Sequence, residues 1–262
     1  MPKPLYKRIL VKLSGEFLGK PQTQYMGGQS KDKISSSLPA PTTTSRRERQ
    51  DSNPLDLFIS QLKDVKNLPL EIAVVIGAGN IIRGVNAQDM GIDRYTSDYM
   101  GMIGTLINAL YLKDVLSKNG INSSIMSSLE VKNICPLFSK ERALKLLSKG
   151  ETLILAGGTG NPYFSTDTAS ALKAVELKAD VLLKITKVDG VYDSDPMTNP
   201  KARKFDKLTY QQVIEKNLKV IDLTAISLCK ENNMPIIVFD VQKPNSIKRI
   251  LNGEKVGTII RG

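Results

Sequence analysis

A glycine-rich turn between an apolar run and a helical pattern constrains this chain most. The turn spans Gly157 to Thr168, reads GGTGNPYFSTDT and contains three glycines. Residues 152–156 before it have the length and β-branched content of a buried strand, and apolar residues over 169–175 follow at the spacing of one helix face. Glycines admit backbone N–H groups close to an anion, and the helix dipole favours negative charge. The stretch therefore predicts an anion-binding corner with Thr166 or Asp167 as the helix N-cap; an ordinary strand–turn–helix corner is the alternative.

Three further strand ends carry polar residues of the same kind. Strands predicted over 7–13, 71–76 and 179–185 run into SGE, GAGNIIRG and TKVDGVYDSDP, respectively. Strand and helix patterns alternate along the chain, which predicts an α/β fold: a three-layer sandwich with a central, mostly parallel sheet. Open sheets of this kind bind ligands outside the carboxyl ends of their strands. Lys12, at the end of the first strand, could bridge phosphates there; a surface lysine beside a turn is the alternative.

The amino-acid composition excludes several kinds of catalytic and metal-binding site. The chain has 262 residues, 41% of them hydrophobic, and no histidine. The lack of histidine excludes His-based triads, His general bases and His metal sites. Cys135 and Cys229 stand apart, so we expect neither a disulfide framework nor a zinc site, and a reducing cytoplasm fits. No apolar run reaches the roughly 18–20 residues of a membrane span, so no membrane partner is expected.

The charge balance is strongly basic. A formal net charge of +11 suits polyanionic partners, from nucleotides to RNA. The lysines are scattered, however, and the one dense basic run is Arg46-Arg47-Glu48-Arg49. A solvated, lysine-rich surface explains the charge better than a nucleic-acid partner, which we do not expect.

Residues 20–54 differ from the rest of the chain. They are rich in Ser, Thr, Pro, Gln and Gly and poor in large apolar residues, so they cannot bury much surface. We expect a flexible insertion within a single domain that spans residues 1–262. Asn53-Pro54, at its end, is a typical start for the next helix.

A long helix is predicted after a loop over 85–96, with Ser97 as its N-cap. Asp98 would then lie in the first turn, where a carboxylate favours the helix dipole. That structural role and a contact with a ligand are both open at this point. The apolar side of the helix is expected to include Ile103, Leu106, Ile107 and Leu110.

Four motifs together carry a resemblance. KLSGE, IGAGNIIRG, AGGTGNPYFSTD and TKVDGVYDSDP, in this order, resemble the bacterial UMP kinases of the amino-acid kinase superfamily over residues 5–19 and 71–262. The resemblance implies transfer of the γ-phosphoryl group of ATP to UMP, giving UDP and ADP. It also implies Mg²⁺ that enters with ATP and is held mainly by the nucleotide phosphates, with no direct protein ligand assigned. Homohexamers, activated by GTP and inhibited by UTP, are usual in the family.

The resemblance also implies roles for individual residues. Lys12 and Asp167 match catalytic positions, and Asp167 is at an acidic position associated with magnesium. The residues that match ATP contacts are Lys12, Leu13, Ser14, Gly15, Gly79, Arg83, Thr186, Tyr192 and Asp195. The residues that match UMP contacts are Ala78, Asp98, Thr159, Gly160, Asn161, Pro162, Tyr163, Phe164, Ser165 and Thr166.

Two departures from the family pattern affect these expectations. Ala78 stands where the family has the middle glycine of GGG, so its methyl group could crowd the UMP. The segment from Lys20 to Pro54 replaces a part that carries GTP-responsive residues in some relatives. Two other hypotheses remain: a related kinase acting on a carboxylate or carbamate, and a nucleotide-sensing or RNA-binding protein without turnover.

Overall fold

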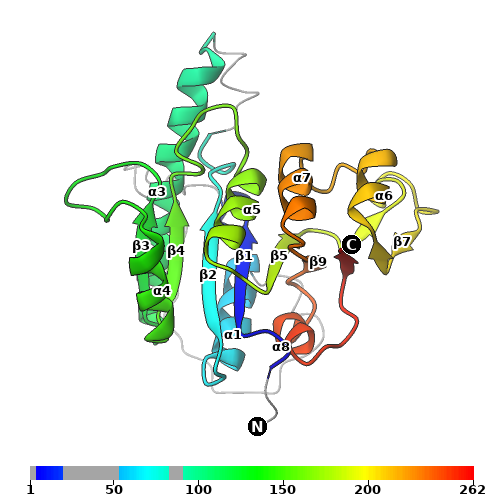
Figure 1. Cartoon of the computed structure of the whole chain (residues 1–262), viewed down its shortest axis with the longest axis horizontal. Coiled ribbons are helices and arrows are strands. Elements are labelled where there is room, and N and C mark those ends of the chain that lie inside the picture. Colours follow the sequence, from blue (N-terminus) through cyan, green and yellow to red (C-terminus); the bar gives the residue numbers. More distant parts are fainter. Residues whose placement is uncertain (1–3, 20–52, 83–90) are drawn as a thin grey trace, which may run out of the picture.

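One mixed sheet forms the centre of the molecule. The computed structural model describes residues 4–19, 53–82 and 91–262. In this part of the chain, eight strands form a sheet with the order β3-β4-β2-β1-β5-β9-β10-β8, and helices cover it (Figure 1). Every pairing is parallel except that of β9 with β10. The strands are β1 (Arg8–Leu13), β2 (Glu71–Ile76), β3 (Ser123–Ser127), β4 (Thr152–Ala156), β5 (Val181–Thr186), β8 (Lys207–Leu208), β9 (Ile236–Asp240) and β10 (Thr258–Ile260).

The helices form a layer on each face of this sheet. α1, α3 and α8 share a core with one set of alternating strand residues, and α4 to α7 share a core with the other. This confirms the predicted three-layer, mostly parallel α/β sandwich. The helices are η1 (Gly15–Leu18), α1 (Pro54–Val65), α3 (Arg94–Lys118), α4 (Lys140–Ser148), α5 (Thr166–Glu176), α6 (Tyr210–Glu215), α7 (Leu223–Glu231) and α8 (Ser246–Leu251). A separate hairpin-like pair, β6 (Val191–Tyr192) with β7 (Lys204–Phe205), lies beyond β5.

The long helix α3 departs from the sequence prediction. It begins four residues earlier than expected, because the Asp93 carboxylate accepts a hydrogen bond from Thr96 N at 3.1 Å and caps the helix. Ser97 is therefore buried within the helix, and Asp98 lies beyond the first turn. The predicted loop is wrong for residues 94–96.

The predicted apolar side of α3 is also mostly wrong. Leu106 is buried, but Ile103, Ile107 and Leu110 are 53%, 55% and 44% exposed. The helix has two apolar sides, and the side that packs on the sheet is a different one. It contains Met102, Leu106, Ala109, Leu112 and Leu116.

The structure also shows which residues cap α5 and α1. Ser165, and neither Thr166 nor Asp167, caps α5, because its Oγ accepts hydrogen bonds from Asp167 N at 3.0 Å and Thr168 N at 3.1 Å. Asn53 caps α1 as expected, with Pro54 as the first helical residue. The rest of the predicted insertion lies outside the described residues.

Candidate active site

Two lysines lie side by side at the carboxyl ends of β1 and β5. Lys12 and Lys184 are register partners on these neighbouring strands. Because strand side chains alternate, both face the side of the sheet on which Leu10 and Leu182 pack against the α5 layer. Asp167, in the first turn of α5, lies between them. Its Oδ1 is 3.1 Å from Lys12 Nζ, and its Oδ2 accepts a hydrogen bond from Lys184 Nζ.

The pKa values of Asp167 and Lys184 are shifted in this cluster. Burial by itself raises the pKa of the Asp167 carboxyl, but the ammonium groups of Lys12 and Lys184 outweigh it and lower that pKa below its usual value. Burial lowers the pKa of Lys184, and the Asp167 carboxylate counteracts the decrease. Asp167 is therefore ionised near neutral pH. Two positive groups against one negative group leave a site suited to a further anion.

The first two strand-end turns pack backbone to backbone beside this cluster. Gly77 N donates a hydrogen bond to Leu13 O at 2.9 Å. A Cβ at Gly15 would lie 2.4 Å from Asn80 Oδ1 and 2.7 Å from Gly77 O, so only glycine fits there. Asn108 of α3 fixes the second turn, since its Nδ2 donates to Gly77 O at 2.7 Å. The KLSG and GAGN motifs are thus one contiguous surface.

Asp222 joins the N-termini of two helices at the site. Its Oδ1 caps α7 by accepting from Ala225 N at 2.9 Å, and the same oxygen accepts from Thr168 Oγ1 at 2.9 Å. Its Oδ2 accepts from Ser165 Oγ, the cap of α5. The backbone N–H groups and dipoles of α5 and α7 therefore converge next to the lysine cluster, which favours an anion.

The tip of the glycine-rich turn is held by α3. Tyr163 has a φ of 71°, a strained conformation for a bulky residue. Asp98 Oδ2 stabilises it by accepting a hydrogen bond from Tyr163 N at 2.6 Å, and the Arg94 guanidinium lies 5.2 Å from the Tyr163 ring centre. In this structure Asp98 positions the turn, while the rings of Tyr163 and Phe164 remain exposed.

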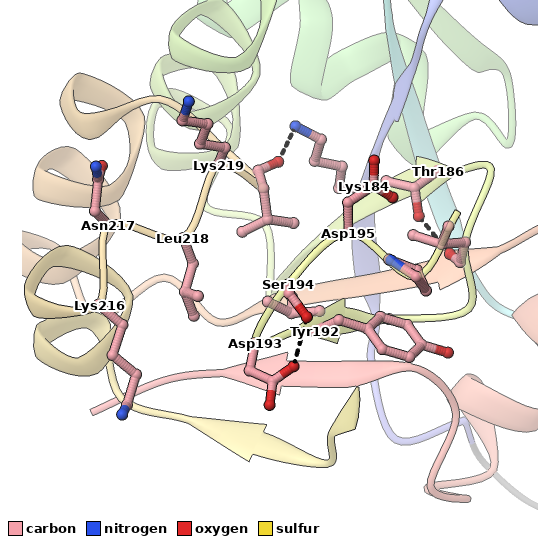
Figure 2. A pocket seen from close by; sticks show the side chains of 15 residues that line it. Lys184, Thr186, Tyr192, Asp193, Ser194, Asp195, Lys216, Asn217, Leu218 and Lys219 are labelled. Carbon is pink, nitrogen blue, oxygen red and sulfur yellow. Dashed lines mark hydrogen bonds between the residues drawn. The ribbon is translucent and has the colours of Figure 1, made fainter. Parts of the chain in front are cut away.

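A cavity of about 570 Å³ opens on the other side of the cluster. Figure 2 shows Thr186, Tyr192 and Asp195 along one wall of it, where the chain runs from the end of β5 through β6. Residues 216–220, between α6 and α7, form the opposite wall, and Lys184 lies where the cavity meets the cluster. The volume and the mixed apolar and polar lining suit a ligand of nucleotide size.

Asp189 fixes the loop that forms the first wall of this cavity. Its carboxylate accepts from Tyr192 Oη at 2.5 Å and pairs with Lys243 at 2.5 Å and Lys204 at 3.3 Å. Burial opposes the charge, but these donors lower the pKa of Asp189 well below its usual value. The hydrogen bond to Asp189 in turn raises the pKa of Tyr192 to about 12.

Comparison with known proteins agrees with this arrangement. The model of the amino acid kinase family matches residues 7–240. The chain belongs to the amino acid kinase family. It is 41% identical over 255 residues to a uridylate kinase of Parabacteroides distasonis, covering 97% of this chain and 98% of that one.

Solved structures of family members superpose over almost the full length. The structure of UMP kinase from Bacillus anthracis matches with a TM-score of 0.81 at 35% identity, covering 98% of this chain and 96% of that chain. UMP kinase from Ureaplasma parvum matches with a TM-score of 0.78 at 31% identity and covers both chains completely.

The structure brings most residues implied by the family motifs to the carboxyl edge of the sheet. Lys12 and Asp167 are in direct contact, the turns with Gly15 and Gly79 adjoin them, and residues 159–166 follow β4 at the same edge. Arg83 lies outside the described residues. Sequence reasoning misses Lys184 within a buried strand, the cap Asp222 as a partner of α5, Arg94, and the wall over 216–220.

The Ala78 side chain lies next to α3. A Cβ built on Gly104 of α3 would lie 3.0 Å from the Ala78 Cβ, and Ala78 itself is buried. The methyl group therefore packs towards α3, in space that Gly104 leaves free.

The described residues contain neither a membrane-spanning helix nor a ready metal site. No helix there combines the length and apolar character that crossing a bilayer requires. No group of three or more Asp, Glu, His or Cys side chains there is arranged to hold a metal ion.

Proposed function

We propose that this chain transfers the γ-phosphoryl group of ATP to UMP, giving ADP and UDP. The observation that carries the proposal is the cluster of Lys12, Asp167 and Lys184 at the edge where the family's strand-end motifs meet. The 41% identity to a uridylate kinase over almost the whole chain supports UMP as the acceptor.

The two nucleotides take opposite sides of the cluster in this proposal. ATP occupies the cavity beside Tyr192, with its phosphates reaching the turn after β1. The ATP contacts proposed are Lys12, Leu13, Ser14, Gly15, Gly79, Arg83, Thr186, Tyr192 and Asp195. UMP lies against the glycine-rich turn and the end of β2, with Ala78, Asp98 and Thr159 to Thr166 as contacts.

The chemistry requires positioning and charge more than covalent assistance. The acceptor phosphate of UMP is ionised near neutral pH, so the lack of histidine is no handicap. Lys12 neutralises charge that develops on the transferred group, and the N–H groups around Gly15 orient it. Asp167 holds the Lys12 ammonium in place. Each of these groups acts best once both nucleotides exclude water from the site.

Mg²⁺ fits this site as a companion of ATP. The described residues hold no acidic cluster for an all-protein metal cage, and Mg²⁺ typically binds through substrate phosphates and one or two carboxylates. Asp167 is the carboxylate within reach of the phosphate position. The ion would neutralise phosphate charge when bound, while Lys12 and Lys184 set the orientation of Asp167.

We also propose that the chain assembles with copies of itself, as a homohexamer. The support is an apolar stripe on α3 formed by Met100, Ile103, Ile107, Leu110 and Tyr111, all exposed in the single chain. Their spacing places them along one side of the helix, and an apolar patch of this kind marks a protein interface. Responses to GTP and UTP belong to the same proposal, as properties of the assembly.

An ADP-release assay tests the proposed reaction. The protein is supplied with ATP, Mg²⁺ and, separately, UMP, CMP, aspartate or acetylglutamate. We expect turnover with UMP far above the other acceptors. Turnover with aspartate or acetylglutamate but not UMP would assign the chain to another branch of the family, and no turnover would favour a binding protein. Adding GTP or UTP to the UMP reaction tests the effectors.

A further inference from the structure

Lys12 and Lys184 lie side by side on one face of the sheet, which has an electrostatic cost. Their Cα atoms are paired across β1 and β5, and their side chains are only 14% and 11% exposed. Like charges directly opposite each other on neighbouring strands are destabilising, and burial increases the cost. The Asp167 carboxylate offsets part of this repulsion, and the Asp222 carboxylate adds a weaker attraction for Lys184.

The two lysines share Asp167 unequally. Lys184 Nζ donates a hydrogen bond to Asp167 Oδ2 and another to Val220 O. Lys12 Nζ lies 3.1 Å from Oδ1, yet that oxygen accepts no well-aligned hydrogen bond from any described residue. Lys184 thus holds the carboxylate by a hydrogen bond, while Lys12 is paired with it at 3.1 Å. Lys12 keeps hydrogen-bonding capacity for another anion.

We propose that Lys184 is a positioning residue for phosphoryl transfer, which holds Asp167 so that the Lys12 ammonium stays available to the transferred group. This inference rests on the proposed function and assigns a role to a residue outside the family's strand-end motifs. Without Lys184, both oxygens of Asp167 would be left to the Lys12 ammonium, and the charge available to the phosphoryl group would fall.

The second hydrogen bond of Lys184 links the reaction centre to the nucleotide cavity. Val220 ends the wall over 216–220, which faces Tyr192 across the cavity (Figure 2). The same wall and Lys184 also border the neighbouring cavity that reaches Asp167. One ammonium group therefore fixes both the wall and the carboxylate. The position of a nucleotide in the cavity is thereby set relative to Asp167.

The experiment compares Lys184→Met with Lys173→Met in the otherwise native protein. Lys173 is a matched control, since it is also buried, lies on α5, and pairs with Glu176 at 2.8 Å outside the cluster. Steady-state kinetics with ATP and UMP are measured at one pH, and thermal unfolding shows that each variant is folded. Wild-type turnover with UMP is measured first, because its absence would refute the proposed function and not the role of Lys184.

We expect Lys184→Met to lower kcat by about 10-fold or more, the order of one lost preorganised group, with KM for UMP within about threefold. Lys173→Met should leave the kinetics unchanged. Lys184→Arg keeps the charge and should restore more kcat than Lys184→Gln, which keeps only a donor. These two variants serve equally if Lys184→Met does not fold. Wild-type kcat in a folded Met or Gln variant, or equal rescue by Gln and Arg, would overturn the proposal.

Discussion

Lys12 is the side chain on which the proposed chemistry depends most directly. It lies at the end of β1 within reach of both Asp167 and the turn at Gly15. Lys12→Ala should lower kcat by roughly 100-fold, the scale for removing one preorganised group that stabilises transition-state charge. Lys7→Ala, which removes an exposed lysine just before the same strand, should change nothing. Kinetics at saturating nucleotide distinguish the two, and a change confined to KM for ATP would contradict the assigned role.

Ala78 and Gly104 form a pair whose sizes must match. A methyl group added at Gly104 would meet the Ala78 Cβ at 3.0 Å. We predict that Gly104→Ala destabilises the protein by about 1–3 kcal/mol, as overpacking does. In an Ala78→Gly background the same change should be stabilising, by about 0.5–1 kcal/mol, because alanine is the better helix former. Denaturant unfolding of the four proteins tests this reversal of sign, and additive effects would disprove the contact.

Asp189 makes stability depend on pH. Its folded-state pKa is below its usual value, so the group contributes stability at a pH above the unfolded pKa of about 4. That contribution is lost as the pH falls below about 4 towards the folded pKa. Asp189→Asn should therefore unfold more easily than wild type at pH 7, with a difference that shrinks by pH 3. Unfolding midpoints from pH 3 to 7 measure it; a constant difference would argue against the ion pairs with Lys204 and Lys243.

Among the helices, α3 carries an apolar stripe that stays exposed in the single chain. Ile103 and Ile107 lie at the middle of its exposed apolar stripe. Ile103→Glu with Ile107→Glu should place two charges in the proposed interface and reduce the assembly to smaller species. Leu5→Glu adds a charge at another exposed apolar residue and serves as the control. Analytical ultracentrifugation gives the masses, and an unchanged mass for the double variant would exclude the stripe from the interface.

The elements differ in how well the sequence predicts them. β2 and β4 are buried on both faces, so each is a short apolar run that can be recognised directly. α3 is harder, because it has apolar residues on two sides and periodicity does not say which side faces the sheet. Its true start depends on Asp93 and Thr96, which form a cap within a stretch that otherwise resembles a loop.

In the molecule as a whole, one part of the site is predictable from the sequence and another part is not. The turns after β1, β2, β4 and β5 are predictable as one site, because parallel strands end at the same edge. Lys184 is not, since ADVLLKI is typical of an ordinary buried strand. Only the register of β5 against β1 places its lysine beside Lys12, and register is a property of tertiary pairing.

In the proposed reaction, the edge of the sheet around Asp167 transfers a phosphoryl group from ATP to UMP. The most direct measurement follows UDP and ADP together by chromatography, for wild type and Asp167→Asn from matched preparations with equal thermal unfolding. We predict that wild type forms UDP and ADP in equal amounts and that Asp167→Asn loses both by roughly 100-fold or more. ADP without UDP from wild type, or undiminished UDP from Asp167→Asn, would contradict the account.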